Sequence, residues 1–264
     1  MEKFIIACFF GIFGLCFGSF ANVVIYRLPR KMSLVRPGSH CPHCNEKIKW
    51  YDNLPLLSYI LLGGKCRNCK GKISIRYPLV EALTGFLWVA SYLAFGLTPL
   101  TFITCFVMLS YIILAFIDIE HYEIPDSINI FLALLGLIAF FFAPLEGSIL
   151  SVSYKRRILS LLSSLILILI FYIFGKLSKK ELIGGGDLKL LIASGIFLGW
   201  ELQVLGLIFA SVIGVFVEIP MRLIAKKSLN ARLPFGPYLA LGFTLALFFG
   251  LKFLEWYISF FQLI

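Results

Sequence analysis

Charged side chains are scarce in this sequence. They make up 14% of the 264 residues, whereas soluble domains carry roughly a quarter. Hydrophobic residues make up 60%, and they gather in apolar runs whose length, about 20 residues, is typical of membrane-spanning helices. This composition excludes a soluble domain, a disordered chain and a collagen-like repeat, and it predicts a membrane protein.

Acidic residues are the scarcer charged class, since 14 Asp and Glu residues stand against 24 Lys and Arg residues, for a net charge of +10. Membrane proteins concentrate basic residues in their cytoplasmic loops, and such loops are attracted to anionic lipid headgroups. We therefore interpret the excess as a topology signal, and we expect membrane lipids, and no nucleic acid, as partners.

Eight apolar stretches bounded by charge, Gly or Pro are candidate transmembrane helices, so we expect an all-α polytopic membrane protein. The first stretch is too long for the core of a signal peptide and is expected to be retained. The sixth is short for a bilayer. The stretches cover residues 4–26, 79–97, 99–117, 127–144, 157–175, 187–200, 203–221 and 236–262.

The only long polar insertion lies between the first two stretches, and the distribution of basic residues places it in the cytoplasm. We therefore expect three parts: a first transmembrane helix (1–26), a small cytoplasmic domain (27–78) and a transmembrane domain (79–264).

The insertion contains two Cys-x-x-Cys motifs, whose spacing is close to that of zinc ribbons. Two thiolates two residues apart can bind one tetrahedral ion, and a second pair completes a four-sulfur site. A domain of about 50 residues has too small a hydrophobic core to fold easily without an additional link such as a bound metal ion. Disulfides are the alternative, but they require an oxidising compartment. We therefore predict structural zinc bound by Cys41, Cys44, Cys66 and Cys69.

Two acidic residues lie at the edges of apolar stretches, where a charge is costly and commonly functional. Asp118 follows the third stretch, and Asp187 begins the sixth, directly after a run of three glycines. The topology places both on the cytoplasmic face. When two carboxylates meet, one holds a proton while the other can accept one from water. Such a pair can activate water for attack on an amide without a metal.

The three glycines, Gly184, Gly185 and Gly186, are expected to adopt positive φ angles and to allow close backbone approach beside Asp187. Each acid also has a structural alternative. Asp187 could cap the sixth helix, as Asp126 is expected to cap the fourth, and Asp118 could be an interfacial charge that reaches toward water.

Two further acids lie near the ends of stretches and have basic neighbours in the sequence. We expect Glu81 to pair with Arg76, and Glu218 to pair with Arg222.

Several motifs follow one another along nearly the whole chain. The first stretch closes with GSFANVVIYRLP (18–29), and NLPLLSY (53–59) lies between the two cysteine motifs. IRYPLVE (75–81) leads into the second stretch. FIDIEH (116–121) with IPD (124–126), GGGDLKLL (184–191) and LPFGP (233–237) complete the series. In this order the motifs resemble those of the type IV prepilin peptidases, also called prepilin leader peptidase/N-methyltransferases, of the GxGD class of aspartic proteases.

The resemblance assigns roles to individual positions. It implies that Asp118 and Asp187 are the catalytic pair, while Glu120 stands where many relatives have Asp, which leaves the pair intact. The supporting positions that it implies are Gly184, Gly185, Gly186, Pro234, Phe235, Gly236 and Pro237, the last four of which are expected to shape a substrate groove.

The family implies cleavage of a basic leader from prepilins and pseudopilins at the cytoplasmic face of the bacterial inner membrane. It also implies methylation of the exposed N-terminal amine with S-adenosylmethionine, although no Gly-x-Gly-x-x-Gly signal locates that site. Two alternatives remain open: an ion-coupled transporter with a regulatory zinc domain, and a peptidase without methyltransferase activity. The sequence does not indicate the oligomeric state.

Overall fold

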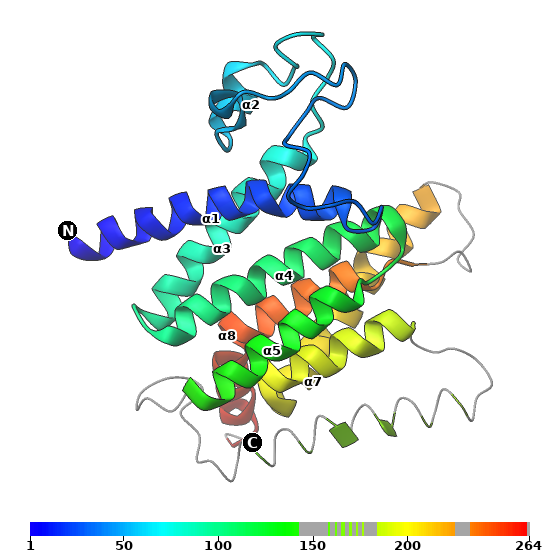
Figure 1. Cartoon of the computed structure of the whole chain (residues 1–264). Helices are drawn as coiled ribbons and strands as arrows, with labels where there is room; N and C mark the ends of the chain where they lie inside the picture. Colours follow the sequence, from blue (N-terminus) through cyan, green and yellow to red (C-terminus); the bar gives the residue numbers. More distant parts are fainter. Residues whose placement is uncertain are drawn as a thin grey trace. The chain divides into compact units, whose positions relative to one another are not determined.

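The computed structural model describes residues 1–142, 184–224 and 233–262, together with isolated helical positions between 158 and 176. In these residues the chain consists of helices joined by turns and loops (Figure 1). Within these residues the only β-structure is a pair of isolated antiparallel bridges, so the predicted all-α class is confirmed. The elements are α1 (Glu2–Arg27), the 3₁₀ helix η1 (Trp50–Asn53), α2 (Leu57–Leu61), α3 (Arg76–Phe95), α4 (Pro99–His121), α5 (Asp126–Phe142), α7 (Gly185–Ile224) and α8 (Gly236–Gln262).

Five of these helices, α1, α3, α4, α7 and α8, are long and apolar enough to cross a membrane, and α5 is apolar but shorter. Large apolar side chains such as Phe9 on α1 and Phe216 on α7 are exposed, as lipid-facing residues would be. The helices therefore support a multi-pass membrane protein. Eight separate spans are not confirmed, because the fifth predicted stretch (157–175) lies largely outside the described residues and the sixth and seventh are joined in α7.

α7 is broken at Gly199, whose φ of 78° and ψ of 168° are not helical. Gln203 Nε2 donates a hydrogen bond of 2.8 Å to the carbonyl of Leu191, twelve residues earlier. In a straight helix these residues would lie about 18 Å apart along the axis, too far for a glutamine side chain. The chain therefore folds back at Gly199, where the absence of a Cβ makes a positive φ inexpensive. The short sixth stretch is thus half of a helical hairpin.

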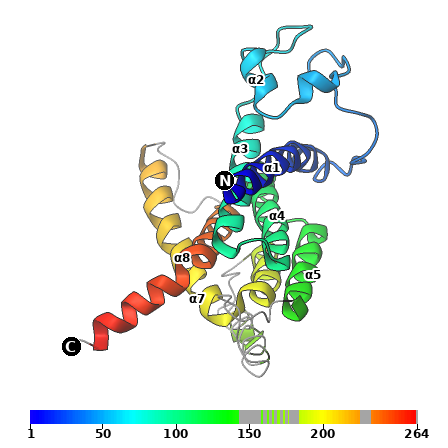
Figure 2. The same ribbon diagram turned by 90° about the vertical axis from the view of Figure 1, so that its left-hand side faces the viewer.

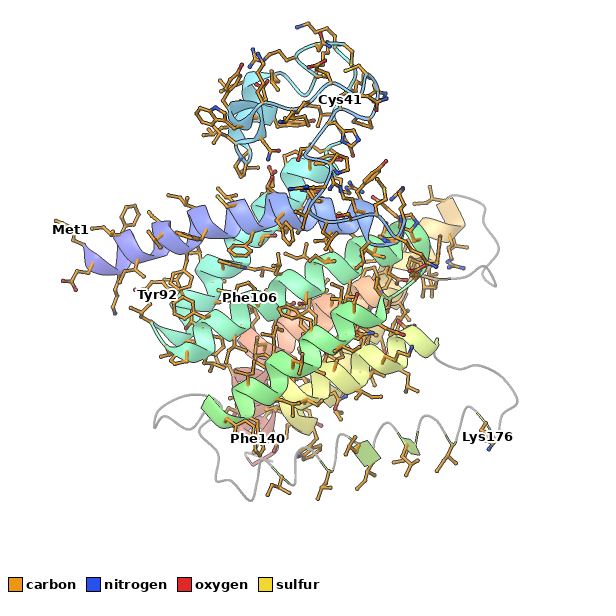
Figure 3. All side chains as sticks on the ribbon, in the orientation of Figure 1. Met1, Cys41, Tyr92, Phe106, Phe140 and Lys176 are labelled. Carbon is orange, nitrogen blue, oxygen red and sulfur yellow. The ribbon has the colours of Figure 1, made fainter. Side chains whose placement is uncertain are left out.

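The chain divides into two compact units, Met1–Ile113 and Leu114–Ile264. In the first unit α1 and α3 touch through small residues. A Cβ on Gly14 would lie 2.8 Å from the Cα of Gly85, so glycine permits the close approach that is common between transmembrane helices. Toward the start of α1, Phe10 stacks at 5.2 Å between ring centroids on Tyr92, which is labelled in Figure 3. The insertion, which contains α2, lies at the N-terminal end of α3 and leads into that helix (Figure 2).

In the second unit the closest helix contact joins α7 and α8. A Cβ on Gly242 would meet the carbonyl oxygen of Gly206 and would lie 2.7 Å from the backbone nitrogen of Ala210. Both of these atoms belong to the backbone, so neither can move aside as the end of a side chain could. The expected pair of Glu218 and Arg222 is confirmed, with 3.0 Å between Arg222 Nε and Glu218 Oε2. The hydroxyl of Tyr238 on α8 donates to the other Glu218 oxygen at 2.9 Å, so this contact also holds α7 and α8 together.

We predict that Gly242→Ala destabilises the second unit by about 1–3 kcal/mol, the usual cost of overpacking a core. Thermal unfolding in detergent measures the effect. Gly250→Ala on the same helix is the control, because its Cβ would first meet the tip of the Leu202 side chain, at 2.7 Å, which can move. Equal melting temperatures for the two variants would contradict the backbone contact between α7 and α8.

Candidate active site and metal centre

The two Cys-x-x-Cys motifs form similar hairpins. One antiparallel bridge closes each hairpin, His40–Lys47 in the first and Lys65–Lys72 in the second. In both, the N–H of the first cysteine bonds back across the turn, from Cys41 to the Glu46 carbonyl and from Cys66 to the Gly71 carbonyl. The two turns therefore present their cysteines in the same way, as the spacing predicts.

The sulfurs of Cys41, Cys44, Cys66 and Cys69 all lie within 4.8 Å of one another, and 3.8 Å separates those of Cys41 and Cys69. Four sulfurs bound tetrahedrally at about 2.3 Å from zinc are about 3.8 Å apart, whereas disulfide sulfurs lie about 2.05 Å apart. The donor set and its geometry therefore fit a single tetrahedral metal ion.

Backbone groups of the second hairpin favour the metal-binding form of one of its cysteines, Cys66. The N–H groups of Cys69 and Asn68 donate to the Cys66 sulfur and lower the pKa of that thiol to about 7. Because only the thiolate binds metal, this hydrogen bonding favours the ligating form at neutral pH.

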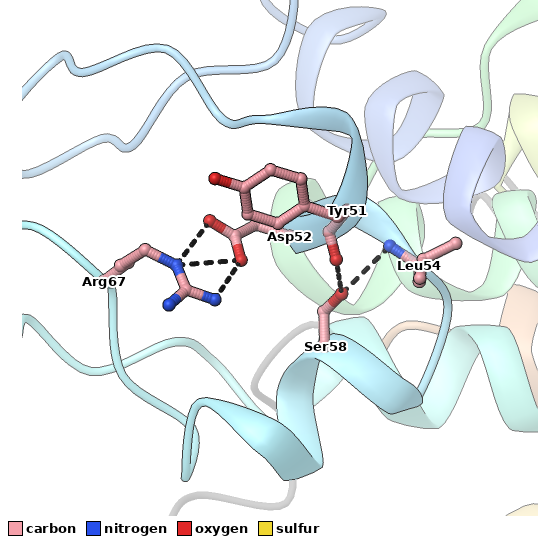
Figure 4. Close-up of polar contacts among 5 residues, drawn as sticks. All are labelled: Tyr51, Asp52, Leu54, Ser58 and Arg67. Carbon is pink, nitrogen blue, oxygen red and sulfur yellow. Dashed lines mark hydrogen bonds and ion pairs between the residues drawn. The ribbon is translucent and has the colours of Figure 1, made fainter.

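An ion pair ties the second hairpin to the rest of the insertion (Figure 4). Arg67, within the second Cys-x-x-Cys motif, donates through Nε and Nη2 to the carboxylate of Asp52 in η1, with the shortest contact at 2.6 Å. These hydrogen bonds hold the pKa of the Asp52 carboxyl below its usual value. Ser58 of α2 accepts from the Leu54 N–H and donates to the Tyr51 carbonyl. η1, α2 and the hairpin are thereby linked.

Asp118 lies inside α4 rather than at its end, because the helix continues to His121. Its side chain is 5% exposed. Its Oδ2 accepts a hydrogen bond of 2.9 Å from the N–H of Gly236, the first residue of α8. The first N–H groups of a helix have no partner within the helix, and they carry partial positive charge. The start of α8 therefore gives Asp118 a hydrogen bond that water would otherwise supply. This buried position differs from the alternative expectation, in which Asp118 is an interfacial charge that reaches toward water.

Gly236 is adapted to this contact. A Cβ at this position would lie 2.8 Å from Asp118 Oδ2, so any side chain would displace the carboxylate. Phe235 is the N-cap of α8, because its carbonyl accepts the N–H of Leu239 at 3.0 Å. Of the four supporting residues Pro234, Phe235, Gly236 and Pro237, the structure thus brings Gly236 directly to Asp118.

Asp187 is in the first turn of α7. The carbonyl of Gly184 accepts the N–H of Leu188, so Gly184 occupies the N-cap position and Asp187 is the third helical residue. The Asp187 carboxylate accepts the N–H of Gly184, which is the acidic half of a capping box. In the alternative interpretation Asp187 is the N-cap itself. In the structure it contributes to capping in a different way, because its carboxylate accepts the N–H of the N-cap residue, Gly184.

The structure brings the two acids into one site. The charge of Asp118 acts directly on Asp187, and the elements that carry them are held by close contacts. A Cβ on Gly186 would lie 3.1 Å from the Cβ of Ile124 in the loop after α4. Two residues beyond Asp187, Lys189 forms an exposed ion pair of 2.6 Å with Asp126 at the start of α5.

Two expectations about this region are wrong. The run 184–186 does not contain a positive φ angle, since the glycines with that conformation among the described residues are Gly63, Gly64, Gly96 and Gly199. Gly186 is needed for close packing instead. Asp126 is not an N-cap, because the Asn129 N–H bonds to the Pro125 carbonyl and makes Asp126 the first helical residue. The sequence did not reveal the contact of Gly186 with Ile124 or the ion pair of Lys189 with Asp126, because each joins segments far apart along the chain.

Comparison with known families divides the chain at α4. The family model described as the bacterial peptidase A24 N-terminal domain matches residues 12–95. The model of the type IV leader peptidase family matches residues 105–219, a range that contains both acids. No solved structure matches the chain.

Several curated relatives match along nearly their whole lengths. A prepilin leader peptidase/N-methyltransferase of Legionella pneumophila is 34% identical over 95% of this chain and 93% of its own. Proteins of the same name from Aeromonas hydrophila and Pseudomonas aeruginosa are 35% and 34% identical, each over 94% of this chain and 92% of theirs. The paired acids, the four-cysteine cluster and these matches together lead to one conclusion: the chain belongs to the type IV leader peptidase family of membrane peptidases.

Proposed function

We propose that this protein cleaves the basic leader from type IV prepilins or pseudopilins and then methylates the new N-terminal residue with S-adenosylmethionine. The names of the relatives support both activities. The observation that carries the proteolytic half is that the carboxylates of Asp118 and Asp187 each lie beside the start of a helix, and that the charge of Asp118 acts on Asp187.

The two acids share one proton and titrate as a coupled pair. The ionised member takes a proton from a water molecule, whose oxygen attacks the scissile carbonyl carbon. The protonated member donates to the developing oxyanion and then supplies a proton to the leaving amine as the carbon–nitrogen bond breaks. Water is consumed, the leader leaves with a carboxylate, and the mature chain leaves with a free amine.

We place both acids and the cysteine domain on the cytoplasmic side of the bacterial inner membrane. The reasons are the gathering of basic residues in residues 27–78 and in the loop at 222–235. Much of that second loop lies outside the described residues. With this topology the apolar helix of the substrate rests among the transmembrane helices, and its junction with the basic leader reaches the acids at the membrane surface.

We propose that the four cysteines bind structural zinc. Four thiolates close the tetrahedral shell, so no position is left for substrate. The ion would stabilise the two hairpins, which have little apolar core of their own; among their cysteines only Cys41 is buried. The polar cytoplasmic domain that zinc stabilises is the largest one available to bind S-adenosylmethionine.

We predict that Asp118→Asn and Asp187→Asn each lower prepilin cleavage by at least about a hundredfold, because each removes one partner of acid–base catalysis. Gel or mass analysis of the product measures cleavage by detergent-purified protein. Asp126→Asn is the control and should cleave normally, since exposed ion pairs such as the one between Asp126 and Lys189 contribute little. A folded variant at either acid that keeps a tenth or more of normal turnover would remove that residue from the pair.

A second prediction concerns the metal. Purified protein should contain one zinc ion per chain, and the double substitution Cys41→Ser with Cys44→Ser should lose it and lower the unfolding temperature. Elemental mass spectrometry and thermal unfolding measure the two effects. Cys8→Ser, in α1 and outside the cluster, should retain the metal. Disulfides among the four cysteines in protein taken from intact cells, without bound metal, would overturn both the zinc site and the cytoplasmic placement.

The two activities should separate. Transfer of a methyl group requires a neutral amine close to the donor and no acid pair. We therefore predict that Asp118→Asn still methylates a pre-cleaved pilin with a free N-terminal Phe, while loss of the metal reduces methylation at least as much as cleavage. Labelled methyl transfer, scored beside leader cleavage, tests both expectations. If folded Asp118→Asn protein fails at both reactions, a shared site is indicated instead.

A further inference from the structure

A second carboxylate is buried among apolar helices, and cleavage does not use it. Glu81 on α3 is 7% exposed. It does not pair with Arg76 as its sequence neighbourhood suggests. Its carboxylate accepts the N–H of Leu56 at 2.9 Å and the hydroxyl of Ser19. Both donors are neutral, and Glu81 forms no ion pair with a basic residue in the described part of the chain.

Asn22 on α1 leaves a second acceptor buried beside the same helix crossing. Its side chain is 1% exposed, and its Nδ2 donates to the carbonyls of Gly18 and Tyr77. Its Oδ1 is buried and accepts no hydrogen bond from any described residue. α1 and α3 are in contact at this level, because a Cβ on Gly18 would lie 2.7 Å from the Cα of Glu81.

The segment that reaches Glu81 is under backbone strain. Leu56, just before α2, has a φ of 60° and a ψ of −47°, which is unfavourable for a residue with a branched side chain. Such strain persists only where surrounding contacts enforce it, and it gathers at functional sites. The bond from the Leu56 N–H to Glu81 is such a contact. It joins the cysteine-bearing insertion to the α1–α3 pair.

Ser19, Asn22 and Glu81, called here the Glu81 cluster, thus combine one carboxylate without a cationic partner and one amide oxygen without a donor. An ionised carboxylate in apolar surroundings requires a compensating charge. A group that supplies both a positive charge and several N–H donors offers what each of these two acceptors lacks. A primary ammonium group has three such donors. Ser19 is half-buried, so the cluster lies at the edge of the helix pair.

We propose that the Glu81 cluster is the binding site for a primary α-ammonium group during methyl transfer. This inference rests on the proposed methyltransferase activity and gives it a location. Two reactants of that chemistry carry the group: the N-terminal residue of the cleaved pilin and the amino acid portion of S-adenosylmethionine. The cluster lies wholly within residues 12–95, which match the N-terminal family model rather than the peptidase model.

The test compares Glu81→Gln with the wild-type protein in detergent. Glutamine keeps an oxygen that can accept from Leu56 and Ser19 but removes the charge. Methyl transfer to a pre-cleaved pilin should fall at least about tenfold, the effect of losing a charged hydrogen bond, while prepilin cleavage is unchanged. Thr84→Val is the matched control. Thr84 is also buried on α3, and its hydroxyl donates to the Val80 carbonyl of the same helix, so both activities should persist.

Asn22→Leu is the second variant, because it removes the open amide oxygen and leaves Glu81 in place. It should likewise lower methyl transfer more than cleavage. The Michaelis constant for pre-cleaved pilin and the dissociation constant of S-adenosylhomocysteine then identify the source of the ammonium group. A rise in the first alone indicates the pilin N-terminus, and a rise in the second alone indicates the methyl donor.

Two results would overturn the assignment. In one, Glu81→Gln methylates as fast as the wild-type protein. In the other, both variants lose cleavage and methylation in the same proportion, which would give the Glu81 cluster a purely structural role. A wild-type protein that cleaves prepilin but transfers no methyl group would instead refute the methyltransferase half of the proposed function, and this inference with it.

Discussion

A carboxylate that leaves water for the interior of a helical membrane protein has to find new hydrogen-bond donors there, and in this chain the donors come from the starts of helices. Asp118 accepts the N–H of Gly236 at the start of α8, and Asp187 accepts the N–H of Gly184 at the start of α7. These N–H groups have no partner within their own helices. Two structural needs, a partner for the helix end and a partner for the acid, are thus met by one contact at each acid.

This arrangement determines much of the packing in the second unit. α8 must begin beside α4, and no side chain fits at Gly236, since a Cβ there would contact the Asp118 carboxylate. α7 must begin beside the loop that follows α4, which Gly186 permits through its contact with Ile124. The fold-back at Gly199 then lets the second half of α7 pack against α8. The acids are held by helix ends rather than by long loops, which suits the proposed hydrolysis, in which the site positions water and an amide bond.

The sequence predicted the apolar helices and the four-cysteine cluster well, because both depend on local patterns. Apolar length defines a span, and Cys-x-x-Cys spacing defines a hairpin turn. It also predicted that Asp118 and Asp187 face the same side of the membrane, and this remains a prediction. It placed a boundary between the stretches 187–200 and 203–221, where α7 is broken at Gly199, but it did not foresee the hydrogen bond from Gln203 to the Leu191 carbonyl across the fold-back. It misassigned the partner of Glu81, because the Leu56 N–H is a backbone donor 25 residues away and leaves no trace in the pattern of side chains.

The two parts of the chain suggest a division of labour in which proteolysis creates the substrate of the second reaction. In the proposed function, hydrolysis at the acid pair exposes an amine that did not exist in the prepilin, and methyl transfer consumes that amine. The most direct measurement is the mass of the product after detergent-purified protein is incubated with a prepilin, with and without S-adenosylmethionine. The account predicts a mature chain without its leader in both samples, heavier by one methyl group at its N-terminus only when the donor is present. A prepilin that keeps its original mass in both samples would contradict it.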